Sequence, residues 1–251
     1  MLLETVRLSK RFGGVAAVAE MDLSVTAGQA FGLIGPNGAG KTTLVNLISG
    51  HLRADAGRVR LDGEDVTGLE PNDLAARGIA RTFQRGRAFK GLTALDNVLV
   101  GRHARMRSDA IRRLWPRGAA DRGDRARALA LLTRLGLERR AGALAGELSY
   151  GDQRRLEIAR ALASEPRVLL LDEPAAGMNP AESARLRELM RSLVAEGLTI
   201  VLIEHDVRLV MGTCERVAVL NFGRKIAEGT PAEVQADPAV REAYLGSEAV
   251  A

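Results

Sequence analysis

Apolar residues recur with two different periods along the chain, and the first of these is the two-residue alternation of β-strands. The segments LETVRL and MDLSVTAG, within roughly the first 30 residues, predict antiparallel strands separated by glycine turns. The apolar run QAFGLIG then leads through several glycines into KTTLVNLISG, which has helical spacing. We therefore expect a buried strand, a glycine-rich loop and a helix that ends at Gly50. GRVRLDGEDV predicts one more strand and turn.

Between about Arg87 and Ala163 the pattern becomes helical. Ala, Leu and Arg recur there at helical spacing in DRARALALLTRLGL and QRRLEIARALA. After Pro166 strands and helices alternate again, in RVLLLDEP, AESARLRELMRSLVAEG and LTIVLIEHD, which predicts a parallel sheet covered by helices. We expect one domain over 1–251, in which 1–86 and 164–251 form an α/β lobe with a β portion and 87–163 form an inserted helical subdomain.

The composition indicates what type of core the protein has and in which cellular compartment it lies. Hydrophobic residues make up 46% of the 251 residues but aromatic ones only 3%, so the core must be aliphatic. No apolar run approaches the ~20 residues that span a bilayer, and the start MLLETVRLSKRF lacks a signal-peptide pattern. Cys214 is the single cysteine, which excludes a disulfide framework and a cysteine metal cluster. We expect a reduced, cytoplasmic setting.

The net charge of +5 comes mainly from arginine, notably in GRHARMRSDAIRRLWPRGAADRGDRARA at 101–128. Clustered arginine could bind nucleic acid or anionic lipid, or it could form a solvated helical face. Asp109, Asp121 and Asp124 interrupt the run, and no aromatic residues alternate with it. We therefore favour the solvated face.

The strongest chemical motif is GPNGAGKT at 35–42, which fits G-x-x-x-x-G-K-[ST] between a predicted strand and helix. Its glycines let backbone N–H groups turn toward phosphate oxygens, and the helix dipole adds positive potential. Lys41 is expected to reach the β- and γ-phosphates of ATP, and the Thr42 hydroxyl to bind Mg²⁺. The predicted ATP-binding residues here are Gly35, Pro36, Asn37, Gly38, Ala39, Gly40, Lys41, Thr42 and Thr43.

Two later strands end in residues suited to phosphoryl transfer. Asp172 follows the apolar run VLLL and is expected to hold Mg²⁺, either directly or through a group that binds the ion, while the adjacent Glu173 is expected to polarise the attacking water. A merely structural role, in which the two acids cap the next segment, is the weaker alternative. His205 ends LTIVLIEH at the same predicted sheet edge, within reach of the γ-phosphate. His51 and His103 have no such placement and are assigned no role.

The phosphate loop, acid pair and histidine, with LSYGDQRR in the helical insert, resemble the nucleotide-binding subunit of ATP-binding cassette (ABC) transporters over nearly the whole chain. The resemblance implies the α/β P-loop NTPase fold of that family, with a mixed, mainly parallel sheet. LSYGDQ corresponds to its signature segment, usually L-S-G-G-Q, from which Tyr150 and Asp152 depart. In the family this segment contacts ATP held by a second cassette; an ordinary helix N-cap is compatible with that role. The predicted signature residues are Ser149, Tyr150, Gly151, Asp152 and Gln153.

Further positions follow from the resemblance alone. Phe12 matches the aromatic that stacks on adenine, with a core phenylalanine as the alternative. Gln84 matches the glutamine that touches Mg²⁺ and the attacking water, and it joins the two lobes. Gly177, Met178 and Asn179 match the loop that crosses the dimer interface, although many cassettes have Asp where Asn179 stands.

The finer resemblance is to the longer ATPase subunit of branched-chain amino acid importers. It rests on ARTFQRGRAFKGLTALDNVLVG, EPAAGMNP and the tail VLNFGRKIAEGTPAEVQADPAVREAYLG. Importers of urea or short amides look alike, and the lipopolysaccharide-export cassette shares the tail at lower fidelity. A soluble nucleic-acid ATPase is a further alternative, but the sequence has no second cassette, long coiled coil or zinc insertion.

The resemblance also implies partners and a location. ATP and Mg²⁺ are the expected cofactors. The expected partners are a second cassette, two transmembrane permease subunits and, indirectly, an extracytoplasmic solute-binding protein. The family favours a heterodimer with a shorter sister cassette, and a homodimer stays open. No nucleic-acid partner is expected, and the protein should lie peripherally on the cytoplasmic face of the membrane.

Overall fold

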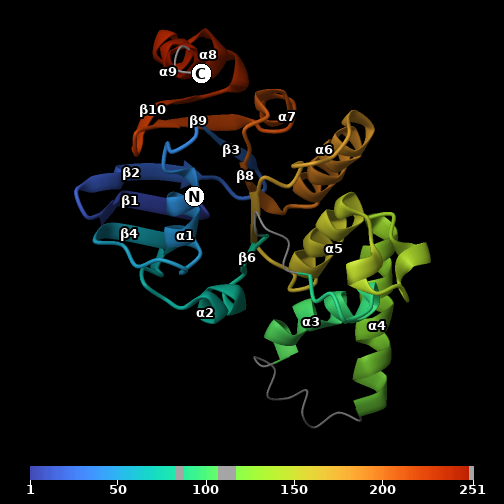
Figure 1. The fold of residues 1–251 in the computed structure, drawn as a ribbon. Coiled ribbons are helices and arrows are strands. Elements are labelled where there is room, and N and C mark those ends of the chain that lie inside the picture. Colours follow the sequence, from blue (N-terminus) through green and yellow to red (C-terminus); the bar gives the residue numbers. More distant parts are fainter. Residues whose placement is uncertain (83–87, 107–116, 249–251) are drawn as a thin grey trace.

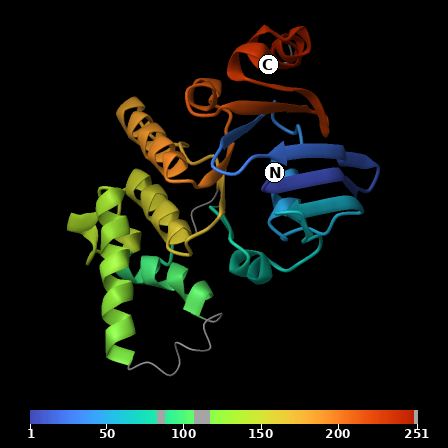
Figure 2. The ribbon, with the colours of Figure 1, turned by 180° about the vertical axis from the view of Figure 1, so that it is seen from behind.

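The computed structural model describes residues 1–82, 88–106 and 117–248. Two sheets lie side by side, and helices α3, α4 and α5 form a group beyond one end of the larger sheet (Figures 1 and 2). The N-terminal sheet is antiparallel with strand order β2-β1-β4-β5, as its short alternating segments predicted. Its strands are β1 (Leu3–Phe12), β2 (Val15–Val25), β4 (Ala56–Leu61) and β5 (Glu64–Asp65).

The larger sheet has the order β10-β9-β3-β8-β7-β6, and every neighbouring pair is parallel except β9 and β10. The strands β3, β7 and β8 are buried along their entire length. Because these central strands run in the same direction, their carboxyl ends meet at one edge of the sheet. The strands are β3 (Ala30–Ile34), β6 (Ile79–Arg81), β7 (Val168–Asp172), β8 (Thr199–Ile203), β9 (Arg216–Asn221) and β10 (Arg224–Gly229).

Helices cover both faces of this sheet. The helix that follows the glycine-rich loop, α1, contributes to the core between the two sheets, whereas α5 and α6 contribute to the core on the opposite face. The α-helices are α1 (Lys41–Ile48), α2 (Pro71–Ala76), α3 (Ala94–Met106), α4 (Arg117–Arg134), α5 (Tyr150–Leu162), α6 (Pro180–Ala195), α7 (Val207–Met211), α8 (Pro231–Ala236) and α9 (Pro238–Glu248); two 3₁₀ turns span Glu138–Arg140 and Ala145–Glu147.

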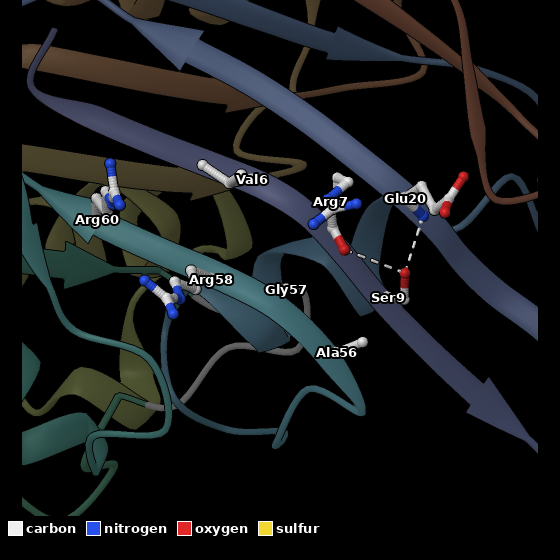
Figure 3. Close-up of a pocket in the computed structure, with 8 residues that line it drawn as sticks. All are labelled: Val6, Arg7, Ser9, Glu20, Ala56, Gly57, Arg58 and Arg60. Carbon is white, nitrogen blue, oxygen red and sulfur yellow. Dashed lines mark hydrogen bonds between the residues drawn. The ribbon is translucent and has the colours of Figure 1, made fainter.

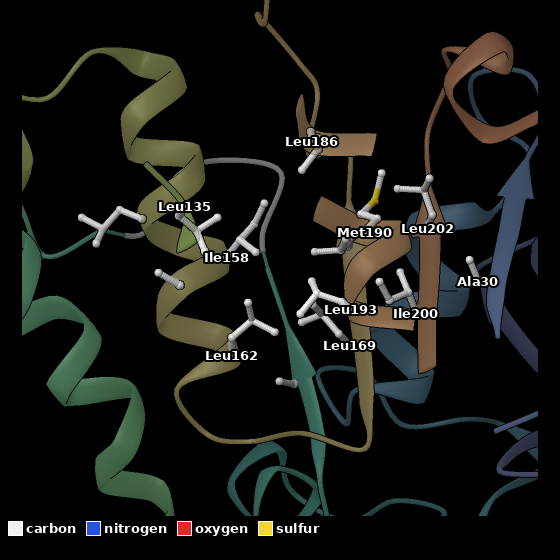
Figure 4. Packing of buried hydrophobic residues seen from close by; sticks show 14 of the residues in the cluster. Ala30, Leu135, Ile158, Leu162, Leu169, Leu186, Met190, Leu193, Ile200 and Leu202 are labelled. Carbon is white, nitrogen blue, oxygen red and sulfur yellow. The ribbon is translucent and has the colours of Figure 1, made fainter. Parts of the chain in front are cut away.

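Strand β7 divides the apolar core into two clusters by its two-residue period. Leu169 and Leu171 join the cluster that packs on α5 and α6 (Figure 4), while Val168 and Leu170 join the cluster toward α1 and the antiparallel sheet. Burying one such side chain contributes about 1.5–3 kcal/mol, so a register slip of one residue would be very costly. The aliphatic core and the α/β fold predicted from sequence are confirmed.

The helices α3, α4 and α5 are held together by close packing and by buried charge. A Cβ atom on Gly101 would lie 2.1 Å from the Arg160 carbonyl oxygen, so only glycine allows α3 to approach α5 this closely. Arg102 donates from Nε to Asp124 at 2.8 Å, and both side chains are buried. The prediction of a solvated arginine face is therefore wrong for Arg102, because its guanidinium is needed to compensate a buried carboxylate.

Three other arginines of this segment, Arg122, Arg125 and Arg127, are exposed and agree with the solvated face. Across the part of the chain that the structure covers, no helix is both long enough and apolar enough to span a membrane.

Candidate active site

The phosphate loop, residues 35–42, requires glycine for steric reasons. Gly35 has φ 149°, and a Cβ there would lie 2.1 Å from the Leu220 carbonyl oxygen. Gly40 has φ 102°, and a Cβ there would lie 2.2 Å from the carbonyl oxygen of Ala17 in β2. Gly40 is also the N-cap of α1 and supplies no side-chain cap, which leaves the first N–H groups of the helix available to an anion.

Lys41 begins α1 and lies buried against this loop. Its Nζ donates to the carbonyl oxygens of Gly35 at 2.6 Å and Pro36 at 3.0 Å. Burial lowers the pKa of Lys41, and the carboxylates of Glu173 and Asp172 oppose that shift. The structure thus brings the lysine of the loop and the acid pair of β7 into one electrostatic environment. Thr42 is exposed and Thr43 is half-buried in the first turn of α1.

Asp172 lies at the carboxyl end of β7 and is buried. Its Oδ2 accepts a hydrogen bond from Arg81 Nη2 at 2.9 Å, whereas Oδ1 is buried with no hydrogen-bond partner in the described residues. Burial raises the pKa of Asp172, and the hydrogen bond from Arg81 opposes this. A buried carboxylate oxygen without a donor fits the hard-oxygen preference of Mg²⁺, which binds few protein ligands.

Glu173 leaves the sheet directly after Asp172 with a strained backbone. Its φ of 49° lies in the left-handed region, where a non-glycine residue costs on the order of 1–3 kcal/mol. Its backbone N–H donates to the Ile203 carbonyl oxygen of β8 at 2.8 Å, which ties the two strand ends together. The half-buried carboxylate is therefore held at the sheet edge beside Asp172.

His205 follows β8 by two residues, and its side chain is 63% exposed. The residue between them, Glu204, is buried and lies with Oε2 3.7 Å from Nδ1 of His205. Sequence reasoning missed Glu204. The available signal was a carboxylate at the end of the apolar strand TIVLI, a position that packing alone would give to an apolar residue.

Arg81 is a second residue that sequence reasoning missed. It ends β6 and is buried, and its Nη1 donates to Asn46 Oδ1 at 2.6 Å and to Ser49 Oγ at 3.0 Å. Arg81 therefore links Asp172 to α1, the helix that carries Lys41. Gln84, three residues after Arg81, lies outside the described residues.

Phe12 lies at the end of β1, paired across the hairpin with Val15 of β2. Its side chain is 50% exposed, and Lys10 Nζ lies 5.8 Å from its ring centroid. The alternative of a core phenylalanine is therefore wrong. The same hairpin reaches the phosphate loop, since Ala17 of β2 contacts Gly40.

The signature segment, residues 149–153, begins α5. Ser149 is the N-cap, and its Oγ accepts a hydrogen bond from the Asp152 N–H at 3.2 Å. The Asp152 carboxylate forms an ion pair with Arg155. This pair offsets the negative charge that Asp152 would otherwise place beside a phosphate. Gln153 Nε2 donates to the Leu148 carbonyl oxygen at 2.9 Å, and Gly151 is buried.

Tyr150 connects this segment to the loop at 177–179. A Cβ on Gly177 would lie 2.8 Å from the Tyr150 ring, so glycine makes room for the aromatic side chain. Arg154 Nη2 donates to the Tyr150 hydroxyl at 2.8 Å. Asn179 caps α6 and forms a capping box with Glu182, a position at which Asn and Asp are about equally effective. Met178 is half-buried.

A short backbone ladder lies just before the signature segment. The N–H groups of Ala94, Ala145 and Gly146 donate to the carbonyl oxygens of Ala143, Leu92 and Lys90 respectively, at 2.9–3.1 Å. The sequence predicted only helices here. Asn97, which is fully buried, holds the same loop, since its Oδ1 accepts from the Phe89 N–H at 2.8 Å and its Nδ2 donates to Thr93 O at 2.9 Å.

Three apolar side chains in and next to this ladder are exposed, Phe89 by 49%, Leu92 by 37% and Leu144 by 42%, and we call them the apolar patch; the Arg160 guanidinium lies over the Phe89 ring, 5.3 Å from its centroid. No residue of the patch belongs to the phosphate loop. A different cleft, of about 550 Å³, lies on the antiparallel sheet and is lined by Arg7, Glu20 and Arg58 among others (Figure 3). No predicted site residue lines that cleft.

Comparison with known proteins gives the family. Residues 18–176 match the family model described as ABC transporter, and 224–250 match the model described as branched-chain amino acid ATP-binding cassette transporter. The branched-chain amino acid transport ATP-binding protein BraF of Pseudomonas aeruginosa is 43% identical over 249 residues, and LivG of Escherichia coli K12 is 41% identical over 251 residues. The lipopolysaccharide export ATP-binding protein LptB of Acidithiobacillus ferridurans is 36% identical over 247 residues. Each alignment covers 98% of both chains.

Solved structures agree with this match. The ADP conformation of MJ1267, an ATP-binding cassette of an ABC transporter, superposes with a TM-score of 0.84 at 34% identity and covers 98% of each chain. The dimeric cassette MJ0796 gives 0.80 at 28% identity and covers 92% of this chain and 99% of its own. The chain belongs to the ABC transporter family, as the subunit that binds and hydrolyses ATP.

The Arg81–Asp172 pair generates a prediction about stability and pH. In Arg81→Met the buried carboxylate loses its partner, and we expect the protein to lose about 3–5 kcal/mol of unfolding free energy near pH 7. The folded-state pKa of Asp172, already raised by burial, should rise further. The folded state then binds more protons than the unfolded state, so the variant should regain stability as the pH falls from 7 toward the ordinary aspartate pKa of about 4.

Urea unfolding at several pH values measures this effect. Arg167→Met is the matched control, because Arg167 pairs with Asp62 at 2.7 Å but both side chains are about half exposed. Such a pair contributes at most about 1 kcal/mol. Equal losses in the two variants, or a loss that does not depend on pH, would contradict the burial argument.

Proposed function

We propose that this ATPase subunit drives import of branched-chain amino acids. The observation that carries the proposal is the match of residues 224–250 to the branched-chain amino acid cassette model, beyond the general cassette match at 18–176. Two relatives named as branched-chain amino acid transport proteins align over nearly the whole chain and support it. The solute itself would be selected by the permease and the binding protein.

We propose that ATP lies with its phosphates on the loop at 35–42. The N–H groups of the loop and of the first turn of α1 would bind the phosphate oxygens. Lys41 would turn from the carbonyl groups of Gly35 and Pro36 to the β- and γ-phosphates. The half-exposed ring of Phe12 would stack on adenine.

Thr42, Asp172 and Gln84 would hold Mg²⁺, which neutralises charge on the phosphates during transfer. The unpartnered Oδ1 of Asp172 supports this assignment within the described structure. Arg81 keeps the other carboxylate oxygen engaged, so Asp172 presents a single oxygen to the site.

Hydrolysis would use Glu173 as general base. The carboxylate would take a proton from water while the water oxygen attacks the γ-phosphorus and the bond to the β–γ bridging oxygen breaks. His205 would contact the γ-phosphate from the neighbouring strand end. The strained backbone of Glu173, fixed by its hydrogen bond to Ile203, supports a role for this position in chemistry rather than in packing.

A second cassette would complete the site. Ser149 and Gly151 would face ATP bound by the other subunit, because the N-terminus of α5 is exposed and Asp152 is neutralised by Arg155. The loop at 177–179, in contact with Tyr150, would lie at the same interface. The family favours a heterodimer with a shorter sister cassette at the cytoplasmic face of the membrane.

The permease would bind to the apolar patch. Its backbone ladder to 143–146 stops three residues before Ser149, so a shift of the patch would reach the signature segment directly. We further propose that residues 87–163 move as one helical unit against the lobe formed by 1–86 and 164–251.

Transport in vesicles tests the proposed solute. With its two permease subunits and its binding protein, the complex should accumulate leucine, isoleucine or valine in an ATP-dependent manner, and a Lys41→Ala complex should not. Uptake of urea or short amides in place of these amino acids would assign the system to that related class of importer. Release of lipopolysaccharide would instead make it an exporter, like LptB, and would refute import.

The Glu173→Gln variant tests the chemistry. It should bind ATP normally but hydrolyse it roughly 10²-fold more slowly or worse, because the amide cannot accept the proton. It should also accumulate as closed cassette dimers with ATP, which size-exclusion chromatography detects. Wild-type turnover by this variant in the assembled transporter would refute the assignment.

The Leu92→Asp variant tests the apolar patch. A charge in the patch should prevent co-purification with the permease while leaving ATP binding unchanged, since no residue of the patch belongs to the phosphate loop. Leu129→Asp on α4 is the matched control, because Leu129 has the same 37% exposure. If both variants assemble equally well, the permease contacts another surface.

A further inference from the structure

Glu204 is a buried carboxylate that the proposed mechanism does not use. It is 1% exposed at the carboxyl end of β8, where removal of a carboxylate from water costs several kcal/mol. Its Oε1 accepts a hydrogen bond from the Ala175 N–H at 2.8 Å. Its Oε2 is buried, has no hydrogen-bond partner in the described residues and lies 3.7 Å from Nδ1 of His205.

The position of Glu204 places it between the two loops that carry the candidate chemistry. Ala175 lies two residues after Glu173, and His205 directly follows Glu204. The loops leave the sheet together, since Asp172 is the register partner of Ile203. A single carboxylate thus contacts the backbone beyond Glu173 with one oxygen and faces the His205 ring with the other.

The charges around this group are few. Burial raises the pKa of Glu204, and the hydrogen bond from Ala175 and the charge of His205 act in the opposite direction. A hydrogen bond from the Asp206 backbone N–H also opposes the rise in the pKa, while the charge of Glu173 adds to it. The carboxylate therefore depends on donors from these two loops.

We propose that Glu204 is a positioning residue for ATP hydrolysis, in which Oε1 fixes the loop after Glu173 and Oε2 accepts a hydrogen bond from Nδ1–H of His205. The inference rests on the proposed role of His205. A small rotation of the exposed imidazole closes the 3.7 Å gap to hydrogen-bond distance. With Nδ1–H held by the carboxylate, a second proton on Nε2 would let the ring donate to an oxygen of the γ-phosphate, as an imidazolium that lies between two anions.

The Glu204→Gln variant separates positioning from packing. Glutamine has nearly the same volume, and the Ala175 N–H keeps its carbonyl oxygen in the place of Oε1. The amide NH₂ then replaces Oε2 and can only donate, so Nδ1 of His205 must become the acceptor and the proton moves to Nε2. A purely structural role would leave the histidine tautomer unchanged.

Nitrogen-15 NMR of histidine-labelled, nucleotide-free protein reads the tautomer directly. The chain has three histidines, so the His205→Ala spectrum assigns the signal. At alkaline pH, with a single proton on the ring, the wild type should carry that proton on Nδ1. Glu204→Gln should shift it to Nε2. A wild-type His205 protonated on Nε2 overturns the proposal without any Glu204 variant, even if that variant fails to fold.

Hydrolysis in the assembled transporter gives the functional readout. Glu204→Gln should lower kcat about 10- to 100-fold, the usual loss for a residue that orients a functional histidine, because the neutral amide no longer stabilises the doubly protonated ring at the γ-phosphate; KM for ATP should change little. Glu215→Gln is the matched control. Glu215 likewise accepts a backbone hydrogen bond, from Ala30 at 2.8 Å, but at the start of β3 and so at the opposite edge of the sheet. It should leave kcat unchanged.

The outcomes separate this inference from the proposed function. A wild-type kcat in Glu204→Gln overturns the positioning role, and so does a lowered kcat with an unchanged tautomer. Normal turnover in Glu173→Gln would instead refute the proposed hydrolytic site. The tautomer measurement needs neither nucleotide nor permease, so it stands independently of that result.

Discussion

Burial of the central strands on both faces is the constraint on which the rest of the structure depends. Between their end residues, β3, β7 and β8 carry no polar side chains, because one face packs on α1 and the antiparallel sheet and the other on α5 and α6. Chemistry can therefore appear only where these strands end. Since they run parallel, the phosphate loop, Asp172 and Glu173, and His205 all leave the sheet at one edge.

Burial of polar groups at that edge costs free energy, and the carboxylates there are only partly satisfied by hydrogen bonds. Among the described residues, Asp172 has a hydrogen bond from Arg81 on one carboxylate oxygen and none on the other, and Glu204 has a hydrogen bond from Ala175 on one oxygen and none on the other. Fully satisfied pairs would make the edge rigid and inert. The half-satisfied carboxylates instead leave capacity for a cation at one position and for an imidazole at the other.

The departures from the usual signature have local physical explanations. Tyr150 packs over Gly177 and accepts from Arg154, so it ties the signature segment to the loop at 177–179 within one chain. Asp152 is neutralised by Arg155, and Asn179 caps α6 as well as an aspartate would. These residues therefore alter contacts inside the subunit and leave Ser149 and Gly151 at the start of α5.

The sequence by itself determined the strands, the helix after the glycine-rich loop and the motif residues, because hydrophobic period and glycine spacing are local properties. It also indicated the family, through motifs whose order is readable along the chain. Only the tertiary structure decided which buried groups are paired. Arg81 with Asp172, Arg102 with Asp124 and Glu204 beside His205 involve strands or helices whose packing brings the charges together, and no local pattern marks such partners. For the same reason Phe12 could be assigned to the surface only once the end of β1 was placed.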